Sequence, residues 1–278
     1  MVWIEEKVID IKQLLKIMSM LRDPQNGCPW DRKQSFQTIA PHTLEEVYEV
    51  VDTIERKDYA QLPNELGDML FQIVFYAQLG KEQDLFDFDE VVSEIGNKLL
   101  QRHPHVFPAA TIESFGDKKN ITPDQVETNW EKIKQSERKQ KGGQDTSILA
   151  DIPAGFPALT RAAKIQKRAS QVGFDWPDHE GAIEKIREET LELEQALAKQ
   201  SPGIIEEELG DLFFSLVNLS RHLKIDAESC LRKATNKFED RFRALESQVA
   251  DDGVELQSLS IEAMEEYWQK VKKAKETN

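Results

Sequence analysis

The chain has 278 residues, enough for one large domain or two ordinary ones, and 39% of them are apolar, so a buried core is expected. Its formal net charge of −15 argues against binding to a nucleic acid polymer, which requires a basic surface. A nucleotide remains compatible with this charge, because divalent metal ions can reverse the local sign. Residues 1–12 lack the apolar core of a secretory signal, and no apolar run could span a membrane. We therefore expect a cytoplasmic protein without a membrane partner.

Four helices are expected in the first half of the chain. The first follows one apolar stripe from Leu44 to Ile54, and Thr43 with Glu46 matches a capping box that would start it. The other three are expected over residues 66–79, 88–100 and 123–139. No stretch alternates with a period of two residues. The sequence therefore predicts an all-α protein with little or no sheet.

The second half of the chain repeats the first. The segment EEVYE at 45–49 matches EETLE at 188–192, and ELGD at 65–68 matches ELGD at 208–211, both displaced by the same number of residues. Asparagine, lysine and arginine of residues 97–102 recur at 236–241, and the WEKIK segment at 130–134 recurs as WQKVK. A polar, glycine-containing stretch separates the copies. We expect two tandem helical domains, residues 1–145 and 146–278.

A pair of carboxylates lies on an unusually apolar helix in each copy. Glu65 and Asp68 share a narrow stripe with Gln72, while the other directions of this helix are apolar and contain no lysine or arginine. Glu208 and Asp211 repeat the arrangement. An unpaired buried carboxylate is costly, and a divalent metal ion removes that cost. This pattern predicts a metal site in each copy.

The preceding helix of each copy supplies three more glutamates. Residues at these three- and four-residue spacings lie on one face of a helix, so antiparallel packing against the next helix would gather several carboxylates. An all-oxygen ligand set favours Mg²⁺, with Mn²⁺ as a substitute. A solvated acidic face is the alternative for these glutamates taken alone. They are Glu45, Glu46 and Glu49 in the first copy and Glu188, Glu189 and Glu192 in the second.

Basic and aromatic residues recur beyond the carboxylates. Two cations four residues apart, with an asparagine beside them, suit a polyphosphate, although an ordinary solvated basic face is an equal alternative. A tryptophan in the last helix of each copy could stack on a base or could simply anchor that helix in the core. These residues are Asn97, Lys98, Arg102 and Trp130 in the first copy and Asn236, Lys237, Arg241 and Trp268 in the second.

Taken together, the motifs Glu-Glu-x-x-Glu, Glu-x-x-Asp and Asn-Lys-x-x-x-Arg resemble the MazG family of nucleoside triphosphate pyrophosphohydrolases. The resemblance covers almost the whole chain and includes the segments GCPWD at 27–31 and GFDW at 173–176. It implies four-helix units of the all-α pyrophosphatase fold that form a homodimer. It also implies Mg²⁺-dependent hydrolysis of nucleoside triphosphates to the monophosphate and pyrophosphate, with broad base tolerance.

The resemblance also assigns roles to the matching residues. Lysine and arginine would hold phosphates, and tryptophan would contact the nucleoside. The chemistry of the residues, rather than the resemblance, makes Glu45, Glu46, Glu188 and Glu189 the candidate catalytic glutamates. Glu45 or Glu188 would take the proton from water. The metal ligands would be Glu46, Glu49, Glu65 and Asp68 in the first copy and Glu189, Glu192, Glu208 and Asp211 in the second.

Three other protein classes compete with this interpretation. A di-iron carboxylate bundle uses Glu-x-x-His, and no histidine of this chain follows a glutamate by three residues. A metal-dependent phosphohydrolase with a His-Asp pair is disfavoured because that dipeptide does not occur. A non-catalytic helical adaptor that binds a metal or nucleotide would leave the carboxylates on apolar helices unexplained.

Overall fold

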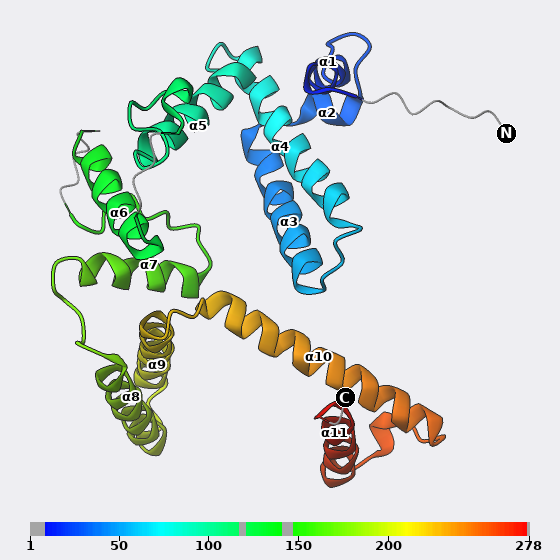
Figure 1. The fold of residues 1–278 in the computed structure, drawn as a ribbon. Helices are drawn as coiled ribbons and strands as arrows, with labels where there is room; N and C mark the ends of the chain where they lie inside the picture. The colour runs from blue at the N-terminus through cyan, green and yellow to red at the C-terminus, as the bar shows by residue number, and fades with distance from the viewer. Residues whose placement is uncertain (1–8, 117–120, 141–146, 277–278) are drawn as a thin grey trace. The chain divides into compact units, whose positions relative to one another are not determined.

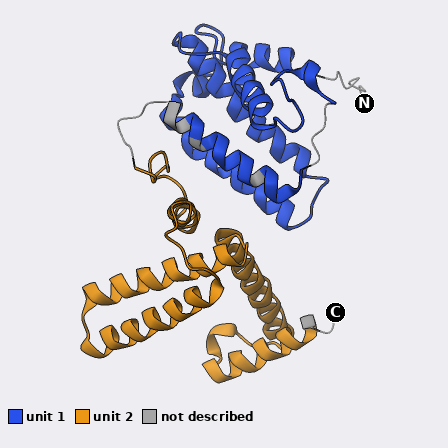
Figure 2. Cartoon of the chain, turned by 60° about the vertical axis from the view of Figure 1, so that its left-hand side comes forward, with its two compact units in different colours: residues 1–142 blue, residues 143–278 orange. Residues whose placement is uncertain are grey.

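The computed structural model describes residues 9–116, 121–140 and 147–276, and in these residues it contains helices and turns but no strand. The prediction of an all-α protein is therefore confirmed. The chain divides into two compact units, residues 1–142 and residues 143–278 (Figure 2). The exact domain limits expected from the sequence, with a junction at residue 145, fall among residues 141–146, outside the described part of the chain, and stay a prediction.

Unit 1 is built around an antiparallel hairpin of two long helices, α3 and α4, which lie side by side (Figure 1). Helix α1 packs against α4, and Met18, Ile39, Val74, Phe75 and Leu79 form the buried core between these helices. Arg22 at the end of α1 forms an ion pair with Glu82 at the end of α4 at 2.6 Å. The helices are α1 (Ile11–Leu21), α2 (Pro29–Lys33), α3 (Phe36–Glu55), α4 (Leu62–Glu82), α5 (Phe88–Arg102), η1 (Ile112–Ser114) and α6 (Pro123–Gln140).

Helix α3 begins eight residues earlier than the sequence suggested, so the expected cap at Thr43 is wrong. Ser35 is the N-cap and forms a capping box with Thr38. Pro41 lies inside the helix, where it has no backbone N–H to donate to the preceding turn. The Thr43 hydroxyl instead contacts the Ile39 carbonyl and the Tyr76 hydroxyl on α4. Thr43 therefore helps to join α3 to α4.

Unit 2 repeats the hairpin as α8 and α9, with α7 packed on α9 (Figure 1). Helix α10 runs on from the hairpin, and α11 packs against its far half around Leu245, Val249 and Val271. Asp175 forms an ion pair with Arg221, and the His222 ring lies 3.2 Å from the same carboxylate, at the end of α9. The helices are α7 (Ala158–Ser170), α8 (His179–Lys199), α9 (Pro202–His222), α10 (Ala227–Asp251), η2 (Leu256–Ser258) and α11 (Ile261–Glu276).

The two hairpins turn in the same way. Lys57, just after α3, and Gln200, just after α8, are the matching residues of the two copies, and both have a left-handed backbone with φ of 58° and 51°. This conformation is uncommon for residues other than glycine. After this turn, the Glu-x-x-Asp helix of each copy runs back along the Glu-x-x-Glu helix that precedes it. The turn therefore positions the carboxylates.

One expectation about the Glu-x-x-Asp helix is only partly met. Its apolar composition predicted burial on nearly all sides, and Val74 and Phe75 of α4 are fully buried. Leu66, Leu70 and Ile73 are exposed, because a single unit does not cover this side of α4. The described helices include none that is both long and apolar enough to cross a membrane.

Candidate metal and substrate site

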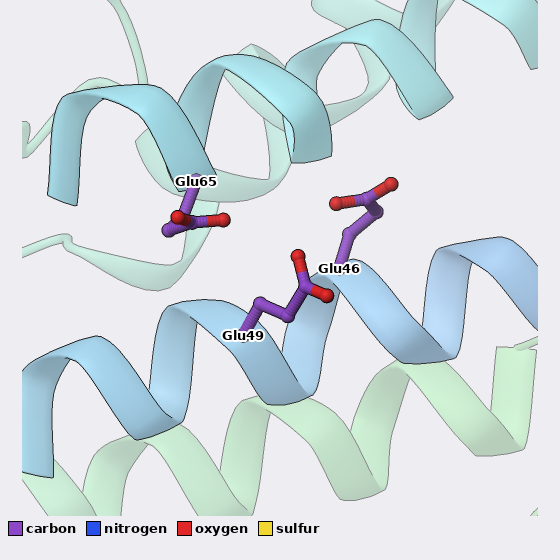
Figure 3. A group of neighbouring side chains, drawn as sticks. All are labelled: Glu46, Glu49 and Glu65. Atoms are coloured by element: carbon purple, nitrogen blue, oxygen red, sulfur yellow. The ribbon is translucent and has the colours of Figure 1, made fainter. Parts of the chain in front are cut away.

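Three carboxylates meet between α3 and α4. Glu46 and Glu49 project from α3, and Glu65 projects toward them from α4 (Figure 3). One oxygen of each lies within 4.8 Å of the others. Glu46 and Glu49 are one turn apart on α3, so both can face the same point on α4. The gathering expected from the sequence is present for these three residues, which we call the first carboxylate set.

Asp68, the fourth ligand expected in the first copy, lies beside this set. The pKa of Glu46 is raised from its ordinary value of 4.5, first by burial and then by the negative charges of Asp68, Glu49 and Glu65. Crowded carboxylates of this kind repel one another unless a cation lies among them. The residues therefore fit a hard divalent ion with oxygen ligands.

The second copy gathers the equivalent residues. Oxygens of Glu189, Glu208 and Asp211 lie within 4.8 Å of one another, and we call these three the second carboxylate set. The pKa of Glu208 is raised, first by desolvation and then by the charges of Glu192, Glu189, Glu207 and Asp211. Glu192 is therefore near the set, as expected. The donor atoms are again all carboxylate oxygens, which suit the same hard ions.

Neutral and cationic side chains hold these carboxylates, and sequence reasoning gave them no role. In the first copy, Gln72 donates to Glu46 at 3.4 Å, Gln61 to Glu65 at 2.9 Å and Asn64 to Asp68 at 3.5 Å. In the second copy, Lys185 forms an ion pair with Glu189 at 2.6 Å, and both Glu189 and Glu188 raise the pKa of its ammonium group. The four-residue spacing of Lys185 and Glu189 was the available signal.

The two candidate general bases lie outside the carboxylate sets. The Glu45 carboxylate is largely exposed and contacts the His42 ring at 3.1 Å. The Glu188 carboxylate is also exposed and accepts a hydrogen bond from Lys185 at 2.9 Å. Both residues adjoin a member of a set in the sequence, namely Glu46 or Glu189. Neither residue belongs to the three in its copy whose carboxylate oxygens lie within 4.8 Å of one another.

The basic residues differ between the two copies. The Arg102 guanidinium donates two hydrogen bonds to the Glu137 carboxylate of α6, at 3.0 Å and 2.6 Å, and this pairing raises the pKa of the guanidinium. Lys98 lies 3.5 Å from Glu94, and Asn97 is exposed. Arg241 has a buried Nε atom without a hydrogen-bond partner. Lys237 is exposed and Asn236 is half-buried on the same helix, α10.

Both tryptophans pack against neighbouring aromatic rings. Trp130 meets His103 edge to face at 5.2 Å, and its Nε1 atom is buried without a partner. Trp268 lies 5.1 Å from Phe238 and packs on the core formed by α10 and α11. Within the described part of the chain, no hydrogen bond or ion pair links Lys98, Arg102, Lys237 or Arg241 to either carboxylate set. The basic and acidic halves of the expected site are therefore separate features here.

Comparison with known proteins agrees with this arrangement. The family model described as the MazG nucleotide pyrophosphohydrolase domain matches residues 34–107 and 178–245. Each match contains one carboxylate set together with the lysine and arginine pair, whereas Trp130 and Trp268 lie beyond it. The matched regions correspond to α3 to α5 in unit 1 and α8 to α10 in unit 2.

Two relatives extend over nearly the whole chain. The nucleoside triphosphate pyrophosphohydrolase of Escherichia coli strain K12 is 49% identical over 267 residues, which are 95% of this chain and 97% of the relative. The nucleoside triphosphate pyrophosphohydrolase/pyrophosphatase MazG of Thermotoga maritima is 44% identical over 273 residues, 98% of this chain and 100% of the relative. The chain belongs to the MazG family and carries its pyrophosphohydrolase domain twice, in tandem.

Proposed function

We propose that this protein hydrolyses nucleoside triphosphates to the monophosphate and pyrophosphate. The observation that carries the proposal is the pair of carboxylate sets, each made by two antiparallel helices and each inside a matched MazG domain. The names of the two full-length relatives support the same reaction class, a hydrolase acting on phosphorus anhydrides. A structural role alone would not require the same crowded carboxylates in both copies.

The proposed cofactor is Mg²⁺, with Mn²⁺ as a substitute. The ligands would be Glu46, Glu49, Glu65 and Asp68 in the first copy and Glu189, Glu192, Glu208 and Asp211 in the second. The ion, when bound, would supply positive charge against the phosphates and make a neighbouring water more acidic. The raised pKa values of Glu46 and Glu208, caused first by desolvation and then by neighbouring carboxylates, support this proposal together with the close approach of the oxygens.

The remaining chemistry is assigned to residues of the chain. Glu45 or Glu188 would accept the proton of the attacking water, since each adjoins a set and is exposed. Lys237 and Arg241 would stabilise the charge that develops on the pyrophosphate, with Asn236 beside them, and Lys98, Arg102 and Asn97 would do so in the first copy. Trp268 or Trp130 would contact the base by stacking. Stacking does not distinguish the hydrogen-bonding edges of different bases, so we propose that the enzyme tolerates a broad range of bases.

We also propose that the chain works as a homodimer. Equivalent apolar side chains of the two hairpins are exposed, and on α4 and α9 their three- and four-residue spacings place them on one face of each helix, as at interaction sites. A second copy packed on these faces could also bring basic residues to carboxylates that they do not reach within one chain. The exposed residues are Tyr48, Leu66, Leu70 and Ile73 in unit 1 and Leu191, Leu209, Phe213 and Leu216 in unit 2.

The setting proposed for this enzyme is the cytoplasm, where its substrates are used. The net charge of −15 supports the proposal that nucleic acid polymers are not partners.

The reaction is tested by identifying the products formed from each nucleoside triphosphate in the presence of Mg²⁺. Phosphorus NMR distinguishes the two anhydride cleavages directly. We expect equal amounts of monophosphate and pyrophosphate, and no turnover in excess chelator. Release of orthophosphate with a nucleoside diphosphate would overturn the proposed function.

A further inference from the structure

The two carboxylate sets are supported by different kinds of side chain. Three amides bind carboxylates of the first copy, from Gln61, Asn64 and Gln72. The matching residues of the second copy are Ile204, Glu207 and Ser215, none of which carries an amide. The sites therefore share their carboxylates and differ in the groups around them, and such outer groups tune metal sites.

Gln72 is the most informative of the three amides. The residue is only 5% exposed, and its Nε2 atom donates to Glu46 of the first set. Its carbonyl oxygen Oε1 is buried and has no hydrogen-bond partner. Exchanging the two amide atoms would not help, because a carbonyl oxygen would then face a carboxylate. A buried acceptor without a partner is costly, so this one points to a ligand, either a cation or the water around it.

The second set already contains a cation of its own. The Lys185 ammonium contacts Glu189 at 2.6 Å and Glu188 at 2.9 Å. The matching residue of the first copy is His42, which contacts Glu45. Glu46 of the first set instead accepts a hydrogen bond from Gln72. A metal ion entering the second set must compete with Lys185 for Glu189. A metal ion entering the first set meets no such competitor among these contacts.

We propose that the first carboxylate set binds one divalent cation in the absence of nucleotide, and that this binding depends on the amide of Gln72. The second set, occupied by Lys185, fills efficiently only when a triphosphate is present to draw the ammonium away. The ion class is Mg²⁺ or Mn²⁺, because every donor is an oxygen. This inference rests on the metal part of the proposed function and adds a division of roles between the copies.

The test is titration of the full chain with Mn²⁺ alone, followed by electron paramagnetic resonance of the free ion. In a background with Glu208→Gln and Asp211→Asn, only the first set is intact, and we expect Mn²⁺ to bind without nucleotide. Gln72→Ser, which introduces the second-copy residue, should weaken that binding roughly 10–100-fold. Gln72→Met keeps the volume but lacks the amide, so it should weaken binding equally even if the shorter serine perturbs packing. Ser215→Ala is the matched control and should change nothing.

The reciprocal background, Glu65→Gln with Asp68→Asn, keeps only the second set. We expect weak Mn²⁺ binding there, strengthened by a non-hydrolysable triphosphate analogue. Unchanged affinity in both Gln72 variants, or equal nucleotide-free affinity of the two sets, would overturn the inference while leaving the proposed reaction intact. Absence of Mn²⁺ binding in both backgrounds, with and without the analogue, would overturn the proposed metal role as well.

Discussion

At Glu46, burial and the repulsion of neighbouring carboxylates both raise the pKa of the side chain. Its raised pKa means that the folded protein binds this proton more tightly than the unfolded chain does. The stabilisation from this proton is complete below the ordinary pKa of 4.5 and is lost as the pH rises through the raised value. At neutral pH without metal, the ionised carboxylate therefore destabilises the fold.

Glu46→Gln should raise the stability of the metal-free protein at neutral pH, because the amide mimics the protonated acid. The gain should not exceed about 1 kcal/mol, since solvent screens a partly exposed group, and it should vanish as the pH falls below the ordinary glutamate pKa. Thermal unfolding in excess chelator measures both effects. A gain that persists unchanged at acid pH would show that charge is not its cause.

Asp68→Asn and Asp211→Asn form a matched pair for activity. Each substitution keeps the shape of the side chain and removes one negative charge from one copy. Loss of a metal ligand or its support weakens binding or activity by about 10–100-fold, so we expect Asp211→Asn to lower total turnover substantially. Steady-state rates at saturating Mg²⁺ compare the two variants. Wild-type turnover in Asp211→Asn with loss in Asp68→Asn would assign the activity to the first copy alone.

How far the site could be predicted depends on the kind of contact. The carboxylates could be placed because three- and four-residue spacings on two antiparallel helices leave few alternatives. The pairing of Arg102 with Glu137 could not, because it joins α5 to α6 across a connection whose path the sequence does not specify. The unpartnered oxygen of Gln72 also depends on the surrounding packing, although its place on the polar stripe of α4 was visible.

At the scale of the elements, helix existence was more predictable than helix limits. The expected helices over 66–79 and 88–100 are present as Leu62–Glu82 and Phe88–Arg102. The start of α3 was misplaced because Thr43 and Glu46 match a capping box, whereas the actual capping box is formed by Ser35 and Thr38, and Ile39 packs in the core. The helix therefore continues through Pro41 and Thr43 despite the local capping signal.

The packing of α11 against α10 should contribute to the stability of unit 2, and a single substitution can test this. Val271 is 2% exposed and packs on Leu245 and Val249, so Val271→Ala should cost about 2 kcal/mol through lost burial and the resulting cavity. Hydrogen exchange of amides in α10 and α11 reports this locally. Ile261, on the same helix and 72% exposed, supplies the control, because Ile261→Ala should leave exchange nearly unchanged. Equal effects of the two substitutions would contradict the proposed core.

At the scale of the whole molecule, the repeat was the most informative feature of the sequence. It predicted two similar helical domains, and the family model finds one in each half. The association of chains could not be derived from it in the same way, since an apolar helix looks alike whether it is buried within one chain or between two. The exposed residues of α4 and α9 are what now support a dimer.

The proposed homodimer predicts a matched pair of disruptive substitutions. Leu70 and Phe213 are equivalent residues, 38% and 52% exposed, and a charge at either would be buried without a partner in a dimer. Leu70→Glu and Phe213→Glu should therefore shift the chain toward monomer in sedimentation experiments, while Ile112→Glu, on an exposed residue outside both hairpins, should not. A wild-type chain that sediments as a monomer would contradict the proposal.

The most direct test of the central claim combines product analysis with loss of both carboxylate sets. We would measure pyrophosphate and monophosphate formation from ATP with Mg²⁺ for the wild-type chain and for the double variant Glu65→Gln with Glu208→Gln, each confirmed to be folded. The account predicts stoichiometric pyrophosphate from the wild type and a rate lower by about 100-fold or more in the double variant. Undiminished pyrophosphate release by the double variant would contradict it.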